Sequence, residues 1–228
     1  MTFRRFLFHL VFLFFSCNTL FSQTMKVTQD YGLWTGVKIK SKHNNFEFTL
    51  EPQVRTFYGF SKINNYIFDF SAEYNINKNF GIATQQRYDH AKKRYTDTQN
   101  NYIYSLDFKY HKRFLSDFKF YYRLRHENEL TNFFFNYRPE KKSTISYRNK
   151  IKLRYDISKT NNIYVSAEIF KIHKQFKSPY YNKLRFYIGD KIKTSWGTFD
   201  CALGYTQELN NAYPAHFLII HVLYELSL

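Results

Sequence analysis

The strongest constraint on the fold is an alternation of apolar and polar side chains that repeats from about residue 30 to the end of the chain. In one segment the apolar residues are Tyr66, Phe68, Phe70, Ala72, Tyr74 and Ile76, and the polar residues between them are Asp69, Ser71, Glu73 and Asn75. Successive side chains of a strand point to opposite faces of a sheet, so each segment predicts a strand with one apolar and one charged face. Many such strands in one chain are typical of a transmembrane β-barrel.

Eleven segments carry this pattern and are expected to form strands. They lie at residues 30–40, 46–57, 64–76, 79–91, 101–112, 117–128, 143–157, 162–172, 183–194, 197–208 and 216–228. Because bacterial single-chain barrels have an even number of antiparallel strands, we expect an antiparallel barrel of about ten to twelve. Eleven is an odd number, and the segment 30–40 is the one left over. An even number would result if residues 24–30 formed a further short strand or if one of the segments were wrongly assigned.

Short connections alternate with longer ones between the predicted strands. The short ones are 77–79, 115–117, 158–161 and 194–197, and the longer ones are 91–100, 129–142, 171–182 and 209–215. Short turns are typical of the periplasmic side of an outer-membrane barrel, and longer loops of its outer side. The last segment is similar to the terminal strand that barrel-assembly machinery recognises, with Leu228 in place of the usual final aromatic residue.

The aromatic content argues against an ordinary soluble domain. The chain has 26 Phe and 21 Tyr, and its aromatic fraction is 21%, although its mean hydropathy is −0.54. Large apolar patches in water drive association, whereas rings that face lipid need no cover. The alternative of a soluble, exported lipocalin-like binding protein would require all these rings to fit in a small interior.

The N-terminus has the organisation of a secretory signal peptide. Arg4 and Arg5 precede a short apolar stretch at 6–15, and Ser22 provides a small residue for cleavage. We therefore expect a cleaved signal peptide at 1–22 and a barrel at 23–228, located in the outer membrane of a Gram-negative cell. Cys17 lacks the residues that usually precede a lipidated cysteine. Without Cys17, Cys201 is the one remaining cysteine, so no intramolecular disulfide can form.

Short motifs spread over the mature chain carry a resemblance to a known family. They are Trp34 and the segments 50–55 (LEPQVR), 122–127 (YRLRHE), 184–189 (LRFYIG) and 203–205 (LGY). In these the chain resembles domain-of-unknown-function family 2490, exported barrels found mainly in Bacteroidota. The resemblance implies an outer-membrane barrel, but no activity and no catalytic residues.

Charged side chains of both signs occupy the face opposite the rings and would line the barrel interior. The basic residues proposed as a lumen ladder are Arg123, Arg125, Arg148, Lys150, Lys152 and Arg154. The acidic residues proposed as their partners are Glu51, Asp69, Glu73, Asp107 and Glu168. Buried charges are costly unless they are paired, so one interpretation is a structural ion-pair network that fills the barrel. The other is a narrow aqueous path whose excess of basic residues favours anions.

A formal net charge of +16 requires an explanation in terms of partners. Basic residues in the predicted outer loops could contact lipopolysaccharide phosphates or could be a solvated surface. These residues are Lys92, Lys93, Arg94, Lys141 and Lys142. Outer-membrane lipids, lipopolysaccharide and the assembly machinery are the expected partners. We expect no nucleic-acid partner, because the chain is exported and has no recognisable nucleic-acid-binding module. The sequence identifies no protein partner.

No catalytic, metal or cofactor motif is recognisable in the sequence. A nucleophile, a base and an orienting group must converge for hydrolysis, and His90, His126 and His221 lie in separate segments without such neighbours. The sequence therefore predicts a barrel that is structural or a narrow channel, with no cofactor. A lipid hydrolase or acyltransferase of the outer membrane is the alternative.

Overall fold

The computed structural model describes residues 28–92, 98–114, 116–131, 143–174, 178–211 and 214–228. Several sequence predictions lie outside these residues: the signal peptide at 1–22 with Cys17, and the loop residues Lys93, Arg94, Lys141 and Lys142. Within the described ranges, no helix has the length and apolar character needed to cross a membrane.

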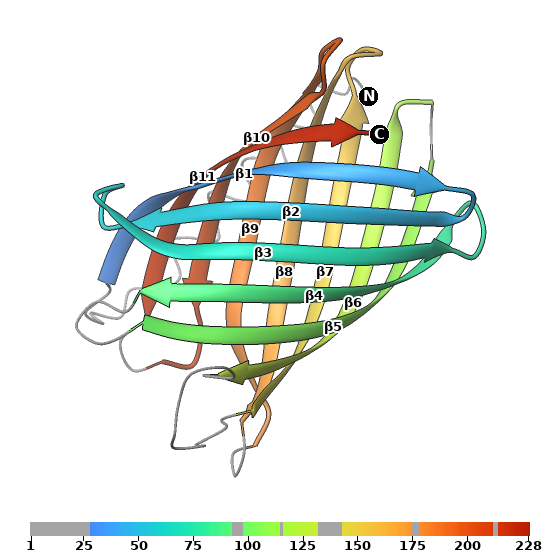
Figure 1. Cartoon of the computed structure of the whole chain (residues 1–228). Coiled ribbons are helices and arrows are strands. Elements are labelled where there is room, and N and C mark those ends of the chain that lie inside the picture. Colours follow the sequence, from blue (N-terminus) through green and yellow to red (C-terminus); the bar gives the residue numbers. More distant parts are fainter. Residues whose placement is uncertain (1–27, 93–97, 115, 132–142, 175–177, 212–213) are drawn as a thin grey trace, which may run out of the picture.

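Eleven strands in the described part of the chain close into one barrel (Figure 1). They are β1 (Thr28–His43), β2 (Phe46–Phe57), β3 (Lys62–Asn75), β4 (Phe80–Lys92), β5 (Thr98–Arg113), β6 (Phe118–Thr131), β7 (Ser143–Asp156), β8 (Asn161–Lys174), β9 (Tyr180–Lys193), β10 (Thr198–Glu208) and β11 (Ala215–Ser227). Each matches one predicted segment, with its ends displaced by three residues or fewer. The prediction of an all-β barrel is confirmed.

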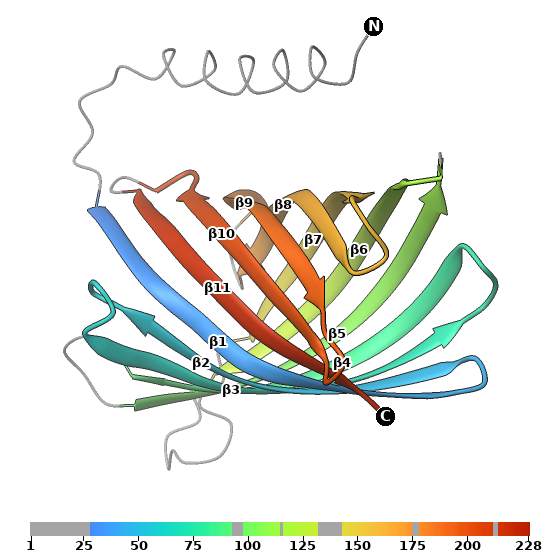
Figure 2. The same ribbon diagram turned by 90° about the horizontal axis from the view of Figure 1, so that it is seen from above.

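The barrel closes through β1 and β11, which lie side by side in parallel from Thr28 beside Ala215 to Lys40 beside Ser227 (Figure 2). The ten other neighbouring pairs of described strands are antiparallel. The eleven described strands lie within the expected ten to twelve, but the expectation of an even number, and with it of an antiparallel closing pair, is wrong. With an odd number of alternating strands, the first and the last run in the same direction, so the seam between them has to be parallel.

Strand direction places the two classes of connection at opposite ends of the barrel. We name the turn end for its connections of two to four residues, which are 44–45, 76–79, 114–117, 157–160 and 194–197. The opposite end, the loop end, has connections of four to eleven residues, which are 58–61, 93–97, 132–142, 175–179 and 209–214. The start of β1 lies at the loop end, because β1 runs parallel to β11. The predicted alternation of short and longer connections matches this arrangement.

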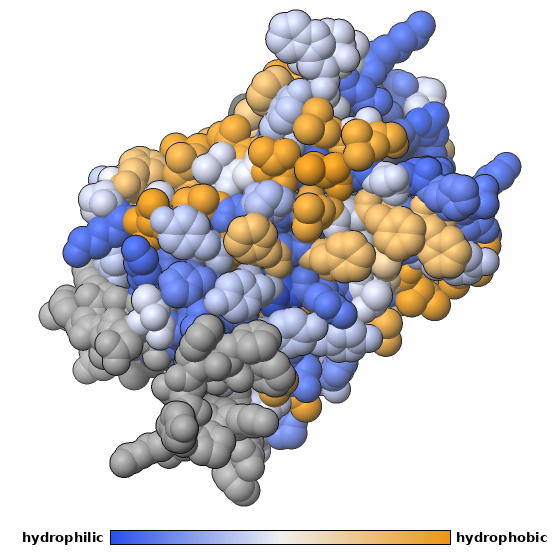
Figure 3. All heavy atoms as spheres, viewed as in Figure 1, coloured by the Kyte–Doolittle hydropathy of each residue, from blue (hydrophilic) through white to orange (hydrophobic). Residues whose placement is uncertain are grey.

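The rings face outward and the charges face inward. On β3 the exposed fraction is 55% for Phe68 and 47% for Phe70, but 5% for Asp69 between them. On β5 it is 47% for Leu106 and 2% for Asp107. Hydrophobic side chains cover much of the outer face formed by β1 to β4 (Figure 3). The distribution is the reverse of that in a barrel that is stable in water, where apolar residues fill the interior.

Aromatic side chains form pairs near both ends of the outer face. At the turn end, ring centroids lie 5.0 Å apart in Phe46–Tyr74 and in Phe199–Tyr224. At the loop end, Tyr205 lies 5.7 Å from His216 and donates or accepts a hydrogen bond with its Nδ1. Aromatic pairs therefore flank the outer face at both ends of the barrel.

Two glycines make room for tyrosines on the neighbouring strand. A Cβ at Gly189 would lie 2.5 Å from Cζ of Tyr164, and a Cβ at Gly204 would lie 2.4 Å from Cε1 of Tyr187. Each glycine is the cross-strand partner of its tyrosine. The two tyrosines can therefore lie against the inner wall of the barrel, where they line the lumen.

Candidate functional site

The lumen contains two cavities that meet at Trp34. The larger, about 380 Å³, extends from the middle of the barrel toward the turn end. The smaller, about 170 Å³, lies toward the loop end. Trp34, Arg55 and Arg185 line both cavities and so form the partition between them.

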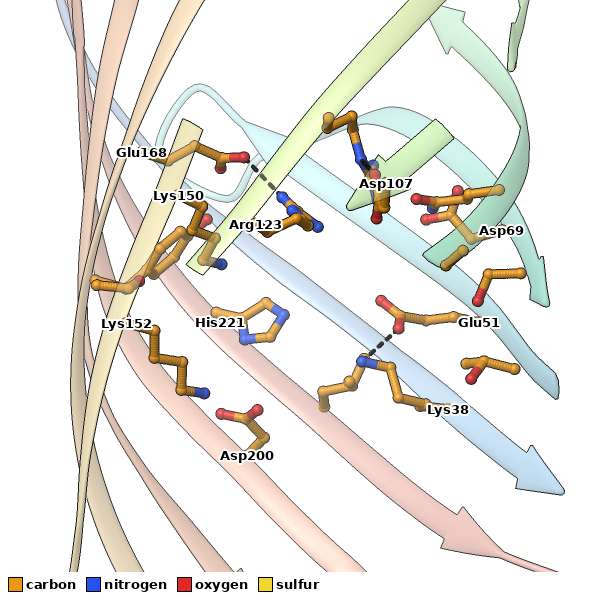
Figure 4. Close-up of a pocket in the computed structure, with 18 of the residues that line it drawn as sticks. Lys38, Glu51, Asp69, Asp107, Arg123, Lys150, Lys152, Glu168, Asp200 and His221 are labelled. Atoms are coloured by element: carbon orange, nitrogen blue, oxygen red, sulfur yellow. Dashed lines mark hydrogen bonds and ion pairs between the residues drawn. The ribbon is translucent and has the colours of Figure 1, made fainter. Parts of the chain in front are cut away.

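Every acidic residue proposed as a lumen partner forms an ion pair. The nearest nitrogen–oxygen distances are 2.6 Å for Lys38–Glu51, 2.7 Å for Arg87–Asp69, 2.5 Å for Lys109–Glu73, 2.6 Å for Arg125–Asp107 and 2.7 Å for Arg123–Glu168. Figure 4 shows four of these carboxylates, Glu51, Asp69, Asp107 and Glu168, which lie around the cavity on different strands. Both the Asp69 and the Asp107 carboxylates accept two hydrogen bonds from one guanidinium, the strong bidentate geometry.

Glu168 and Glu127 hold three arginines in the middle of the lumen. Glu168 on β8 accepts hydrogen bonds from Arg123 on β6 and from Arg148 on β7, at 2.7 and 3.0 Å. Glu127 accepts another from Arg148 at 3.0 Å and lies 3.9 Å from Arg125. Three arginines of the predicted basic ladder, Arg123, Arg125 and Arg148, are therefore paired with carboxylates of the lumen.

A second network joins the two sides of the parallel seam near the turn end. Glu225 on β11 forms ion pairs with Lys40 on β1, at 3.4 Å, and with Lys191 on β9. Lys191 also lies 2.9 Å from Asp200, whose other oxygen accepts a hydrogen bond of 2.6 Å from the hydroxyl of Tyr164. These contacts fix the seam by side chains as well as by backbone hydrogen bonds.

Some inward-facing basic residues form no ion pair with a carboxylate in the described part of the chain. They are Arg55, Lys150, Lys152, Lys183 and Arg185. The ammonium of Lys152 instead lies 3.5 Å from the ring centroid of Tyr164. Because twelve basic and seven acidic residues line the larger cavity, its potential is positive.

The predicted ladder thus separates into two groups. Arg123, Arg125 and Arg148 belong to the ion-pair network, and Arg154 pairs with Asp156 at 3.0 Å near the turn end. Lys150 and Lys152 face the cavity without a carboxylate partner. Of the predicted loop contacts, Lys92 is the described one, and it is exposed at the loop end of β4.

Sequence reasoning missed the role of Trp34 as the partition. The guanidinium carbon of Arg55 lies 3.8 Å from the centroid of the indole, and that of Arg185 lies 5.0 Å from it. Gly32 and Gly36 flank Trp34 at two-residue spacing, so no side chain of β1 crowds the indole on that face. A large aromatic residue between two glycines on an inward-facing register was the signal that could have identified it.

The histidines do not converge in the described structure. His221 lines the larger cavity (Figure 4), whereas His90 and His216 bond to Asn100 and Tyr205 near the loop end. Among the described residues, no group of three His, Cys, Asp or Glu residues has the geometry to hold a metal ion.

Comparison with known proteins identifies the family. A family model described as a protein of unknown function (DUF2490) matches residues 31–214, which include all of the partition and most of the barrel. No curated protein and no solved structure matches the chain. The match covers most of the chain and agrees with the resemblance seen in the sequence, so the chain belongs to the DUF2490 family.

Proposed function

We propose that the protein is an outer-membrane barrel whose narrow lumen favours small anions. One observation carries the proposal: the apolar face of the closed barrel is exposed, whereas the lumen has twelve basic and seven acidic residues along its larger cavity. In water this surface would drive association, but in a bilayer it is the expected lipid-facing surface.

The barrel form itself supports a membrane location. A closed sheet leaves no edge strand with unpaired backbone groups, which is the condition for crossing a bilayer with strands. The aromatic pairs near both ends, such as Phe46–Tyr74 and Tyr205–His216, would lie at the two membrane interfaces, where membrane barrels carry aromatic rings. A cleaved signal peptide at 1–22 would export the chain to that membrane.

The size of the lumen supports a narrow path instead of a general pore. Porins with about 16–18 strands leave an open aqueous channel, whereas barrels of about eight strands are filled by side chains. Eleven strands give two cavities of about 380 and 170 Å³ with Trp34 between them. We therefore expect small ions to pass and larger solutes to be retained.

If the loop end faces outward in the outer membrane, basic residues there would contact lipopolysaccharide phosphates. Lys92 is exposed there, and Lys93 and Arg94 follow it in the sequence. Charge-assisted bonds to phosphate would hold the loop end among anionic lipids.

Conductance in planar bilayers tests the channel proposal. In a gradient of potassium chloride, the reversal potential should shift from zero toward the equilibrium potential of chloride. The single-channel conductance should be small. Replacing Lys150 and Lys152 together by Gln should reduce this anion preference, since both face the larger cavity without a carboxylate partner. The control is Lys112→Gln with Lys193→Gln, which removes the same charge from exposed positions at the turn end. A folded barrel that conducts no ions, or prefers cations, would contradict the proposal.

A further inference from the structure

Three cations line the smaller cavity, Arg55, Lys183 and Arg185, and none of them forms an ion pair with a described carboxylate. Arg55 and Arg185 both contact the indole of Trp34, at 3.8 and 5.0 Å. Arg185 and Lys183 also lie 5.0 and 4.8 Å from the ring of Phe170. Like charges held this close in a partly desolvated site repel one another, and a bound anion would relieve that repulsion.

The carboxylate that lines the smaller cavity is already engaged in other hydrogen bonds. Among the described residues that line the smaller cavity, Glu208 is the one carboxylate. Its Oε2 accepts hydrogen bonds from Nδ2 of Asn211, at 2.9 Å, and from the backbone N–H of Ala215, at 3.1 Å. Glu208 therefore joins Asn211 to Ala215, and among the described residues it forms no ion pair with Lys183, its cross-strand neighbour.

Trp34 supplies an independent sign of a missing acceptor. The residue is 7% exposed, and its indole N–H has no hydrogen-bond partner among the described residues. A buried donor without an acceptor costs about 1–3 kcal/mol, and such groups are uncommon in native structures. An oxygen of a bound anion would satisfy this donor between the two guanidinium groups.

The two register shifts of the sheet lie beside the cations of the smaller cavity. The ladder register shifts between Arg55 and Thr56 in β2, and between Phe170 and Lys171 in β8. Both positions supply residues to the cluster, and Lys183 is the cross-strand partner of Phe170. The extra residues are Asn64 in β3 and Asn182 in β9. β-Bulges are frequent next to functional sites, so both irregularities are consistent with a site at this position.

The other residues that line the cavity indicate what the ligand carries besides its anionic group. Phe57 and Phe217 contribute an apolar wall, with their ring centroids 5.1 Å apart. Thr206 accepts a hydrogen bond of 3.2 Å from Nε of Arg185 and fixes that guanidinium. A cavity of about 170 Å³ that is lined by both cations and rings fits a small anion that also has an apolar part.

We propose that Trp34, Arg55, Lys183 and Arg185 form a binding site for a small organic acid, with its carboxylate between the cations and its apolar part against Phe57 and Phe217. The proposal deepens the proposed function, because it names the class of anion that the lumen takes. Binding in detergent is independent of conductance, so the two can fail separately.

The two tryptophans of the chain allow a direct measurement. Trp196 is 84% exposed at the turn end, and Trp196→Phe leaves Trp34 as the remaining tryptophan. Hexanoate, acetate and inorganic phosphate are titrated against this folded variant in detergent, with hexanol and hexylammonium as uncharged and cationic controls. Hexanoate should change the Trp34 emission saturably and bind at least tenfold more tightly than acetate or phosphate, while the two controls should not bind.

Variants then locate the site. In the Trp196→Phe background, Arg55→Gln with Arg185→Gln should weaken hexanoate binding at least tenfold, measured by calorimetry because these changes also alter the surroundings of Trp34. Lys183→Gln alone, which keeps both indole contacts, should weaken it several-fold. Lys112→Gln with Lys193→Gln should leave binding unchanged. Absence of saturable hexanoate binding, or equal loss in the surface and cavity variants, would overturn the site, and tighter binding of phosphate would overturn its preference for an organic acid.

Discussion

At the scale of single residues, the facing of each side chain follows from the alternation, but its partner does not. The inward register of Asp107 is evident from the rings at Leu106 and Phe108, because neighbours along a strand face opposite ways. That Glu168 on β8 would hold Arg123 on β6, two strands away, depends on the register of three strands and on barrel curvature. The local pattern contains neither quantity.

The bidentate pair of Arg125 and Asp107 should contribute strongly to folding. Both side chains are buried, with side-chain exposures of 6% and 2%. Asp107→Asn removes the bidentate counter-charge of the guanidinium and leaves Glu127, 3.9 Å away, as its remaining carboxylate. We therefore expect the free energy of unfolding to fall by about 3–5 kcal/mol. Denaturant unfolding in detergent micelles measures this change. The double variant Asp107→Asn, Arg125→Gln should recover part of the loss, and an unchanged midpoint for the single variant would refute the role of the pair.

A charge on the outer face should impair membrane assembly. Phe68 is 55% exposed on the outer face of β3, and Phe68→Arg should cost about 2–4 kcal/mol if this position lies near the bilayer midplane. The measurement is the yield of folded barrel in lipid vesicles. Phe68→Leu, which keeps an apolar side chain, is the matched control and should fold normally. Equal yields for the two variants would contradict the lipid-facing assignment.

At the scale of strands, almost the whole order of elements could be predicted, but the pairing of strands that closes the barrel could not. Period-two alternation marks each strand directly, so each predicted limit lies within three residues of the observed one. Nothing in the alternation states which strand neighbours the first one. The pairing of β1 with β11 is set by how many strands the curved sheet needs before its ends meet, and the even-number rule therefore failed here.

The seam between β1 and β11 can be tested by a cross-link. Val37 on β1 lies directly beside Tyr224 on β11. In a chain in which Cys17 and Cys201 are replaced by Ser, Val37→Cys with Tyr224→Cys should form an oxidant-induced bond that a reductant reverses. Adjacent strands are about 4.7–4.9 Å apart, within reach of a disulfide.

The control for the seam uses the next strand along. Phe199 on β10 pairs with Tyr224, so it lies one strand further from Val37. Val37→Cys with Phe199→Cys should therefore give no cross-link. A link in the control, or none in the seam pair, would show that β11 is not the neighbour of β1.

The close packing of Tyr187 over Gly204 should also contribute to the stability of the barrel wall near the seam. Gly204→Val places a side chain where the ring of Tyr187 lies, and overpacking of this kind costs about 1–3 kcal/mol. The midpoint of denaturant unfolding should fall accordingly. Gly204→Val combined with Tyr187→Leu should recover stability, because the smaller side chain vacates the space. A variant as stable as the parent protein would contradict the packing.

At the scale of the whole molecule, one feature accounts for both the surface and the interior: the usual placement of apolar side chains inside and charged side chains outside is inverted. The strands expose rings and bury charges, and the charges are tolerated because carboxylates and guanidiniums pair across strands. The residual positive charge lies on basic residues that form no ion pair with a described carboxylate, at Lys150 and Lys152 and around Trp34. The alternation predicted the inversion, but the division of the lumen by Trp34 required the three-dimensional structure.

The most direct test of this account is the electrophoretic mobility of the protein in purified outer membranes, compared before and after boiling. A folded transmembrane barrel resists detergent, so the account predicts that the protein is recovered in the outer-membrane fraction and migrates faster when it has not been boiled. Recovery as a soluble periplasmic protein, with the same mobility in both samples, would contradict it.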